Sequence, residues 1–428
     1  MSRMDHLLWE PYLHASRRVL SYAMRPLLGL FAVLAVFAAA CGGDEDPADT
    51  TAPPSQTFSG TPSPTLTLME SPCPYPDLDI YRIDVAKAET STVAQGQRAR
   101  WSHDGSLMSY WGIVGSNCAA GIAVDRMDTL KRAFILPGAS PYSEWSPTSN
   151  TLLTGGMGNV DVDLELIFFD DASVPIIRSV FHGQVGAVSW SRDGSRFAYV
   201  NGETNEIVVY DIPSRDSIVF PSPLGGIPGG IGEIAWSPMG ERLAVWAYEH
   251  RDDGPNVSHL NFLSIADGTT TEITGLAGAA FPEWSPDGSM LIFAVTKDPV
   301  GEIYILPTDG SAPARKLVDG DGGAWSPDGS LIAYTPNACN GWDIAVIAPD
   351  GTGQRILSPG AGHRFQLGFE WAPDGSRAAF LTDDATYTVS TDGTSLTRIG
   401  SQMEKLAWSP DSRYLVGQEI AGRGLCDG

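Results

Sequence analysis

Continuous apolar runs, separated by turn sequences, recur along most of this chain. Residues 290–293 (Met-Leu-Ile-Phe) and 331–334 (Leu-Ile-Ala-Tyr) are two such runs, each a few residues after a tryptophan. A strand with one face in water alternates apolar and polar side chains, so an unbroken apolar run predicts a strand covered on both faces. Spacings of 37 to 48 residues between eight tryptophans predict a repeat architecture. These residues are Trp101, Trp145, Trp190, Trp236, Trp284, Trp325, Trp371 and Trp408.

A tight turn follows each tryptophan. In the two clearest copies it reads Ser-Pro-Asp-Gly, at residues 285–288 and 326–329. Proline pre-sets φ for the first corner, aspartate bonds back to the backbone, and glycine takes the left-handed position. Further on, residues 302–306 and 315–318 have the pattern of two more strands, joined by a second turn at Asp309 and Gly310. Each period therefore predicts a four-stranded antiparallel meander.

One meander cannot bury two apolar faces alone, but sheets packed face to face around an axis can. The sequence therefore predicts an all-β protein, a β-propeller of eight four-stranded blades, with each tryptophan filling space between neighbours. Seven blades are the alternative if the degenerate module at Trp145 is not a blade. Departures from the turn motif weaken single turns by about 1 kcal/mol each. They are His103 and Arg192 in place of proline, Met239 in place of aspartate, and Ser149 and Ser412 in place of glycine.

The last module has too little sequence after it for four strands. It begins at Trp408, and only 20 residues follow. The missing pair has a match near the other end of the chain, where residues 78–84 and 89–94 have the pattern of a third and a fourth strand. We therefore expect the N-terminal strands to complete the last blade, which would close the ring and remove two open sheet edges.

The repeated Trp-Ser-Pro-Asp-Gly motif and its apolar strand resemble the TolB-type, WD-repeat-like propeller module. The resemblance covers about residues 78–428 and implies the propeller fold. The same module looks similar in periplasmic scaffold proteins and in the propeller halves of serine peptidases, so it does not imply one function. Two features depart from TolB: a short polar linker stands where TolB has a folded domain, and TolB has fewer blades.

Residues 1–40 have the pattern of an export signal. Arg17, Arg18 and Arg25 precede an apolar run over residues 27–40, which is too short to span a bilayer comfortably. The run ends in Ala-Ala-Ala-Cys-Gly at residues 38–42, which resembles a bacterial lipobox, so we expect Cys41 to carry lipid. An ordinary cleaved signal peptide is the alternative. The true start can be Met1 or Met24.

Residues 41–76 are rich in proline, threonine, serine and aspartate, and they predict a disordered tether before a propeller at residues 77–428. Without residues 1–40, which hold four basic and two acidic residues, 23 basic and 49 acidic residues remain, a net charge of −26. Such a surface repels nucleic acid and anionic lipid heads. We therefore expect no nucleic-acid partner, and attachment to a membrane through an acyl chain rather than through charge.

Four cysteines remain after Cys41, and no pair has the Cys-x-x-Cys spacing of zinc or redox sites. Cys73 precedes the first N-terminal strand and Cys426 follows the last C-terminal strand, so closure of the ring would bring them to one end of a blade. We predict a Cys73–Cys426 disulfide, with Cys118–Cys426 as the competitor and the pairing of Cys339 open.

No catalytic constellation stands out, so we expect a protein that is not an enzyme and needs no cofactor. The sequence has no Gly-x-Ser-x-Gly elbow and no His-Glu-x-x-His motif. The five histidines after residue 40 are scattered along the sequence. His103 falls in a turn. His182, His250 and His363 fall in expected loops, where they could meet at one mouth of the channel or be unrelated surface residues; His259 is the fifth.

Two pairs of aspartates are candidates for calcium binding. They are Asp319 and Asp321, which we place in a loop between blades, and Asp161 and Asp163, but turn formation is the commoner role of such pairs. We therefore expect no metal. The repeated aspartates of the module are interpreted as turn-formers: Asp104, Asp193, Asp287, Asp328, Asp374 and Asp411.

Function in propellers usually resides in loops at one face, which carries the connections between blades and between second and third strands. The long connections here are residues 223–230, 249–253 and 360–365. We expect a monomeric, lipid-anchored scaffold at the cell envelope that binds a protein or peptide there. The alternatives are a propeller enzyme that acts on a polysaccharide or uses a quinone cofactor, and a structural envelope protein.

Overall fold

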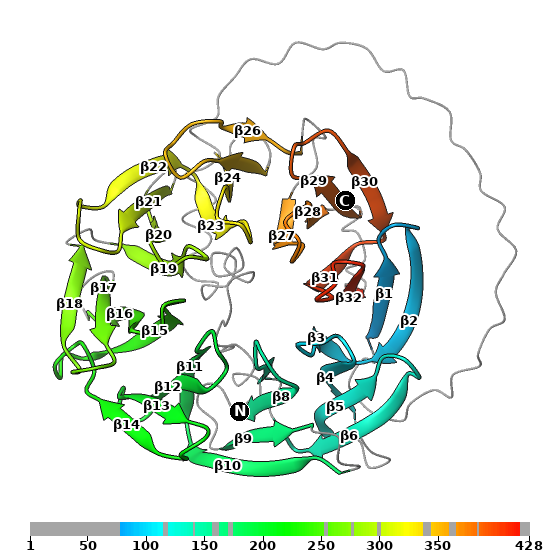
Figure 1. The fold of residues 1–428 in the computed structure, drawn as a ribbon, viewed down its shortest axis with the longest axis horizontal. Helices are drawn as coiled ribbons and strands as arrows, with labels where there is room; N and C mark the ends of the chain where they lie inside the picture. The colour runs from blue at the N-terminus through cyan, green and yellow to red at the C-terminus, as the bar shows by residue number, and fades with distance from the viewer. Residues whose placement is uncertain are drawn as a thin grey trace, which may run out of the picture.

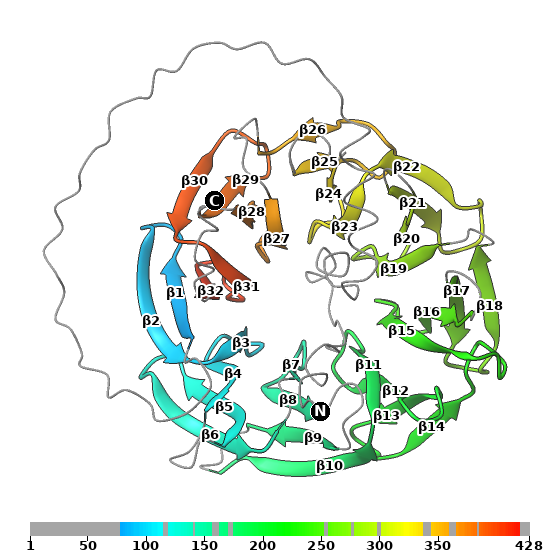
Figure 2. The same ribbon diagram turned by 180° about the vertical axis from the view of Figure 1, so that it is seen from behind.

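The computed structural model describes residues 78–113, 119–139, 142–155, 162–169, 174–251, 256–274, 278–297, 301–336, 344–358, 365–382 and 385–419. Eight four-stranded antiparallel sheets surround one axis (Figures 1 and 2). The predicted eight-bladed propeller is confirmed, and the module at Trp145 is a blade, so the seven-blade alternative is wrong. Within the described ranges, no helix is long and apolar enough to span a membrane.

The first four blades follow the chain from the inner to the outer strand. Blade 1 comprises β3 (Gln97–Trp101), β4 (Leu107–Ile113), β5 (Ala120–Arg126) and β6 (Lys131–Pro137). Blade 2 comprises β7 (Tyr142–Trp145), β8 (Thr151–Gly155), β9 (Val162–Phe168) and β10 (Ile176–Gly183). Blade 3 comprises β11 (Val185–Trp190), β12 (Arg196–Asn201), β13 (Ile207–Asp211) and β14 (Ser217–Phe220). Blade 4 comprises β15 (Gly229–Trp236), β16 (Arg242–Glu249), β17 (Val257–Ser264) and β18 (Thr270–Thr274).

The next three blades repeat this order. Blade 5 comprises β19 (Ala279–Trp284), β20 (Met290–Val295), β21 (Glu302–Pro307) and β22 (Arg315–Asp319). Blade 6 comprises β23 (Asp321–Trp325), β24 (Ile332–Thr335), β25 (Ala345–Ile347) and β26 (Arg355–Ile356). Blade 7 comprises β27 (Phe365–Trp371), β28 (Arg377–Thr382), β29 (Thr386–Ser390) and β30 (Leu396–Gly400).

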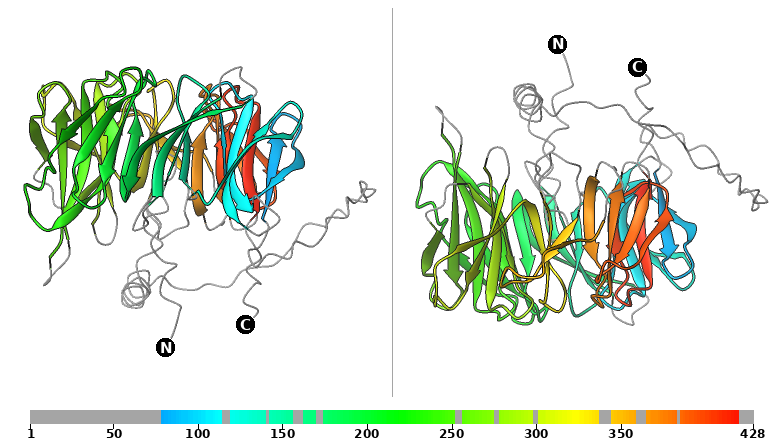
Figure 3. Two further views of the ribbon diagram at one scale, coloured as in Figure 1. Left: turned by 90° about the horizontal axis from the view of Figure 1, so that it is seen from below. Right: turned by 90° about the horizontal axis from the view of Figure 1, so that it is seen from above.

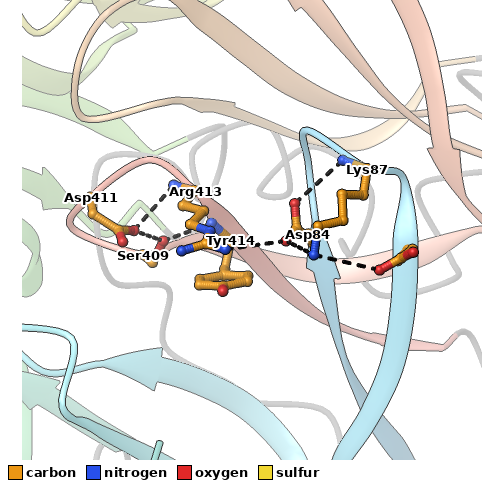
Figure 4. A network of polar contacts seen from close by, with 7 residues as sticks. Asp84, Lys87, Ser409, Asp411, Arg413 and Tyr414 are labelled. Atoms are coloured by element: carbon orange, nitrogen blue, oxygen red, sulfur yellow. Dashed lines mark hydrogen bonds and ion pairs between the residues drawn. The ribbon is translucent and has the colours of Figure 1, made fainter. Parts of the chain in front are cut away.

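Blade 8 is built from both ends of the described chain, as the sequence predicts. Its strand order is β2-β1-β32-β31, with β31 (Met403–Trp408) and β32 (Tyr414–Glu419) joined by β1 (Asp79–Asp84) and β2 (Glu89–Gln95). Strands β1 and β32 pair from Ile80 opposite Gln418 to Asp84 opposite Tyr414. Figure 4 shows the polar contacts at this junction, where the Asp84 carboxylate lies 3.4 Å from Lys87 Nζ and 3.8 Å from Arg413 Nη2.

The turn after each tryptophan owes its shape to a small hydrogen-bond network. In blade 6, Ser326 Oγ donates to the Asp328 carboxylate at 2.7 Å, and that carboxylate accepts the Ser330 backbone N–H at 3.0 Å. Gly329 closes the turn at φ 72°, the left-handed conformation that the motif reserves for glycine. These hydrogen bonds, led by that from the Ser326 hydroxyl, lower the pKa of Asp328. The same network forms in blade 8 around Asp411 (Figure 4), so these aspartates form turns as predicted.

The ring is a flat disc with two different faces (Figure 3). We call upper the face that carries the connections between blades and between second and third strands, and lower the face that carries the other turns. On the lower face the post-tryptophan turns touch their neighbours. A Cβ atom added to Gly105 would lie 3.4 Å from Pro410 of the neighbouring blade. A Cβ atom added to Gly329 would likewise lie 3.4 Å from Pro286. The motif therefore also packs one blade against the next.

Apolar side chains fill the spaces between the sheets. Ile332, Ala333 and Tyr334 are all less than 5% exposed, which confirms that the second strand of this blade is covered on both faces. Seven apolar clusters occupy the eight interfaces between blades. Six clusters each join two blades, whereas one runs without interruption through blades 2, 3 and 4.

Candidate functional site: the inner wall and the upper face

The strand nearest the axis in each blade forms what we call the inner wall: β3, β7, β11, β15, β19, β23, β27 and β31 (Figures 1 and 2). Each of these strands ends in the repeat tryptophan. In six blades the indole N–H donates to the backbone oxygen of the residue before the tryptophan of the preceding blade. Trp284 Nε1, for example, lies 3.0 Å from the Ala235 oxygen. The tryptophan thus fills space between blades as predicted, and it also carries a hydrogen bond that the sequence analysis did not anticipate.

Two tryptophans lack this bond. The buried Nε1 atoms of Trp190 and Trp236 have no hydrogen-bond partner among the described residues. Both lie in interfaces filled by the three-blade apolar cluster. At one of these interfaces a different contact joins the blades, because Ser189 Oγ accepts the backbone N–H of Trp236 at 2.9 Å.

The inner wall is irregular. In seven blades the pairing of the first strand with the second shifts at a β-bulge, and only β7 pairs with β8 without a shift. In blades 1, 5 and 8 the residue three before the tryptophan lies in the bulge, and these residues, Arg98, Phe281 and Lys405, have φ of 59°, 56° and 57°. Residues other than glycine rarely adopt this left-handed conformation. Bulges and such conformations concentrate near functional sites, so the inner wall is a candidate site.

Arg98 and Lys405 come from adjacent blades, 1 and 8, and occupy the same position of the repeat. A buried side chain holds the backbone around them: Gln418, 3% exposed, accepts the Arg98 backbone N–H at its Oε1 atom, at 2.9 Å. Its Nε2 atom donates to Glu404 Oε1, also at 2.9 Å. The buried Gln418 amide therefore links the Arg98 backbone of blade 1 to the Glu404 side chain, which is next to Lys405 in blade 8.

Across the ring, the equivalent position is aromatic. The Phe281 ring lies 4.8 Å from the Trp246 ring, whose buried N–H has no partner in the part of the chain that the structure describes. Phe281 also lines a cavity of about 10 Å³ with Ile292, Phe293, Ala294, Ile303, Gly322 and Gly323. This volume is comparable to the space of one water molecule, and the lining is apolar. The cavity is therefore too small to hold an organic ligand in this conformation.

The upper face of blade 5 carries an ion-pair network. Glu302 accepts hydrogen bonds from the Lys297 and Lys316 ammonium groups, which lower its pKa to about 2, and Lys316 Nζ lies 2.5 Å from Asp319 Oδ1. The predicted loop around Asp319 and Asp321 is only Gly320, because these aspartates end β22 and begin β23. Burial raises the pKa of Asp321. Across the described ranges, no three histidine, cysteine, aspartate or glutamate side chains are grouped so that they could hold a metal ion.

Of the histidines predicted to lie in loops, His182 does not lie in one. His182 lies within the outer strand β10 rather than in a loop, and its Nδ1 atom is 2.7 Å from Asp163 Oδ1. An outer strand faces away from the axis, so this part of the prediction is wrong. His103 is in a lower-face turn, and His250 follows β16. His259 lies in β17, where its Nε2 atom is 3.8 Å from Glu249 Oε2 and its Nδ1 atom is 3.7 Å from Glu272 Oε1. Asp161 and His363 lie outside the described residues.

Several predicted features lie outside the described ranges, and they stay predictions. They are the signal and tether, the lipidation site Cys41, the disulfide partners Cys73 and Cys426, and Cys118 and Cys339. Of the long upper-face connections, residues 223–230 join β14 to the start of β15. Residues 249–251 are described, and residues 252–253 and 360–364 are not.

The fold and its meander blades define a β-propeller of the repeat type that carries a tryptophan in each blade and an aspartate turn in most of them. A family model described as the TolB β-propeller domain matches residues 177–414, more than half of the chain. The chain therefore belongs to the TolB β-propeller domain family. No sequence among the curated proteins matches it.

Solved structures of similar fold have low sequence identity. An oligogalacturonate lyase from Vibrio parahaemolyticus is 13% identical, with 76% of this chain and 98% of that chain covered and a TM-score of 0.51. TolB from Acinetobacter baumannii is 15% identical, with 75% and 78% covered and a TM-score of 0.38. Hydrazine synthase from Kuenenia stuttgartiensis is 13% identical, with 70% and 94% covered and a TM-score of 0.44. At these identities the likeness shows the fold alone.

Proposed function

We propose that this protein is a lipid-anchored, extracytoplasmic scaffold that binds a protein or peptide with the upper face of its propeller. The observation that carries the proposal is the charged and ordered upper face of blades 4 and 5. There the Lys297–Glu302–Lys316–Asp319 network and the Arg251–Glu249 pair hold side chains in place on a rigid ring. Ordered polar groups at the ends of rigid strands suit recognition of a partner, because little side-chain entropy is lost on binding. Membership of a family named for TolB supports a scaffold at the envelope.

Site-specific photo-crosslinking in native membranes tests the binding face. A photoreactive residue replaces Glu203, an exposed residue of the upper-face turn of blade 3, and in a matched control it replaces Met239, 66% exposed on the lower face. The proposal predicts one discrete crosslinked protein from position 203 and none from position 239. Crosslinks from the lower face alone, or from neither face, would contradict it.

The lipid anchor has its own test. Metabolic labelling with a radioactive fatty acid should mark the wild-type protein, and Cys41→Ser should lose both the label and the membrane association. A labelled Cys41→Ser variant would show that Cys41 is not the attachment site. Retention of unlabelled wild type in the membrane fraction would favour another means of attachment.

The first alternative function is that of a propeller enzyme that acts on a polysaccharide or uses a quinone cofactor. The second alternative is a structural role in the cell envelope. A neighbour of similar fold is named as an oligogalacturonate lyase, so oligogalacturonate is the substrate to try first. The scaffold proposal predicts that purified protein leaves this substrate intact. Sustained cleavage that scales with protein concentration would overturn the proposal in favour of the enzyme.

A further inference from the structure

The carboxylate of Asp321 is separate from the ion pairs beside it. Asp321 begins β23 at the upper end of the inner wall of blade 6, and its side chain is partly buried. It makes no hydrogen bond or ion pair with any described residue, and burial is the cause that raises its pKa. Its oxygen atoms still reach solvent, because neither is among the fully buried polar atoms that lack a partner. Within the described ranges, Asp321 is therefore an accessible carboxylate without a counterion.

The neighbouring charges on the upper face are already balanced. Lys316 Nζ lies 2.8 Å from Glu302 and 2.5 Å from Asp319, and Lys297 also contacts Glu302. These two lysines and two acids have no net charge together. Asp321, two residues after Asp319, adds a negative charge that this network does not compensate. A partly buried charge without a counterion is unfavourable for the fold, so it needs another explanation.

Glycines bring the backbone close to this carboxylate. A Cβ atom added to Gly301 would lie 2.2 Å from Asp321 Oδ1, so only glycine leaves room for the carboxylate there. The same Cβ position lies 3.1 Å from the backbone oxygen of Gly320, so two oxygen atoms surround one point. The Gly320 N–H donates to the Gly301 oxygen at 2.9 Å, which fixes the two segments to each other. The backbone thus holds two hydrogen-bond acceptors close together.

A cation with several N–H donors complements such a pair of acceptors. An ammonium or guanidinium group donates hydrogen bonds and accepts none, and its bonds to a carboxylate are among the strongest in proteins. The chain carries a net charge of −24, which attracts cations over long range. Partial burial strengthens an ion pair relative to one in open solvent. Because no described group of three ligating side chains could hold a metal ion, an organic cation fits the site better than a metal.

We propose that Asp321 and the Gly320 carbonyl oxygen bind a lysine or arginine side chain of a peptide, on the upper face between blades 5 and 6. This inference deepens the proposed function and rests on it for the peptide nature of the ligand. It adds the chemistry of the partner, which is a segment that presents a positive charge. The bound cation supplies the counterion that Asp321 lacks within the described chain, and the fixed ion pairs of blade 5 border the site on one side.

The test uses a defined probe and its neutral counterpart. The probe is a blocked five-residue glycine peptide with one central lysine, and the counterpart carries an acetyl group on that lysine. Ligand-observed NMR titrations of the full-length protein in detergent should show at least about tenfold weaker binding of the acetylated peptide. Asp321→Asn should weaken binding of the lysine peptide by about tenfold, and added salt should weaken binding to the wild type.

A second variant controls for the general attraction of cations to an acidic protein. Glu241 is an exposed residue of the lower-face turn of blade 4, so Glu241→Gln removes one negative charge away from the site. It should leave binding unchanged. Equal affinity for the two peptides, or an equal loss in the two variants, would overturn the site. Calcium that displaces the lysine peptide at equal concentration would overturn the organic cation in favour of a metal.

The melting temperature separates a binding role of Asp321 from a structural one. Asp321→Asn keeps the shape of the side chain and removes an unpaired charge, so the ligand-free variant should melt at or above the temperature of the wild type. Loss of peptide binding together with a lower melting temperature would mean that the carboxylate stabilises the fold, and it would overturn the site.

The outcomes also separate this inference from the proposed function. If the upper-face crosslink to a partner survives in the Asp321→Asn variant, the scaffold stands and Asp321 is not its means of recognition. If no partner is crosslinked but the lysine peptide binds as described, the cation site stands and the scaffold proposal fails.

Discussion

Two arcs of the same ring solve the packing of neighbouring blades differently. In blades 2 to 4, one continuous apolar cluster fills two interfaces, and the indoles of Trp190 and Trp236 have no hydrogen-bond partner among the described residues. The residue three before the tryptophan is buried in each of these blades and is not left-handed. In the rest of the ring, the clusters are separate, each indole donates to the preceding blade, and the described bulge positions of blades 1, 5, 6 and 8 are left-handed.

The difference indicates where the fold is optimised for stability and where it retains strain. Apolar burial is non-directional, and in the first arc the large cluster offsets the cost of two buried indole N–H groups that have no partner among the described residues. The second arc has smaller clusters and uses a directional bond at every interface. Its left-handed residues include Arg98 and Lys405, which are partly exposed. We infer that the first arc serves as the stable frame of the ring.

The largest expected effect comes from a cavity in the three-blade cluster. Phe197→Ala should lower the free energy of unfolding by about 4 kcal/mol, because Phe197 is fully buried and contacts the rings of Trp190, Tyr199 and Tyr210. Phe380→Ala, in the cluster between blades 6 and 7, should cost about 3 kcal/mol. Urea denaturation measures both losses. A larger loss for Phe380→Ala would contradict the idea of a stable frame.

The indole bond gives a smaller, matched effect. Trp284→Phe removes the hydrogen bond to the Ala235 oxygen, whereas Trp190→Phe removes a buried N–H that has no partner among the described residues. Because the two substitutions delete similar ring volume, Trp284→Phe should be less stable than Trp190→Phe by about 1–2 kcal/mol in the same urea assay. Equal losses would mean that the indole bond contributes nothing.

Acid pH should weaken the turns that contain an aspartate, but not the turn of blade 4, where Met239 replaces the aspartate. Burial raises the pKa of Asp104, but hydrogen bonds from Ser106, Asn150 and Ser102 outweigh it and lower the pKa from 3.8 to about 2. A folded-state pKa below the unfolded value gives stability that is fully present above pH 3.8 and is lost as the pH falls towards 2.

Asp104→Asn should therefore reduce stability at neutral pH by about 1 kcal/mol or less, since solvent screens this exposed carboxylate. The difference from wild type should shrink below pH 3.8 and vanish near pH 2. Met239→Asn, at the equivalent position of blade 4, should show no such pH dependence. A constant difference between Asp104→Asn and wild type across this range would show that the turn carboxylate is not involved.

The smallest expected effect concerns backbone strain. Arg98→Gly should leave stability unchanged or raise it by less than about 1 kcal/mol, because it relieves a left-handed residue. Ala187→Gly, at the same repeat position of blade 3, should lower stability by about 1 kcal/mol, because this residue is buried and relaxed. Thermal denaturation of the two variants gives the sign of each change. Loss of stability in both would indicate that Arg98 is kept for packing.

The sequence predicts most of the fold because its signals repeat. Eight tryptophans in phase, each followed by a turn and an unbroken apolar run, define the blade, and the short sequence after Trp408 predicts the donated strands. The weak turn at Ser149 did not prevent a blade, because Leu152 and Leu153 still bury completely. Redundant apolar burial thus outweighs a single unfavourable turn.

The candidate site is much less evident from the sequence. Backbone φ at Arg98 and Lys405 depends on a bulge whose place is set by pairing with β4 and β32, and no single residue encodes it. The sequence did contain one signal. The position three residues before the tryptophan is a cation in the first and last modules, Arg98 and Lys405, whereas the module of blade 6 has Gly322 there. The sequence analysis also placed His182 in a loop, whereas this residue lies in β10. The end of β10 is polar, and no turn motif near β9 indicates that the two strands pair.

The account depends most directly on the difference between the two arcs, which we interpret as relaxed at the position three before the tryptophan in blade 3 and strained there in blades 1 and 8. The decisive measurement is the melting temperature of the Arg98→Gly, Lys405→Gly double variant beside that of Ala187→Gly. We predict a melting temperature at or above that of the wild type for the double variant and a lower one for Ala187→Gly. A double variant that melts below the wild type would contradict the account.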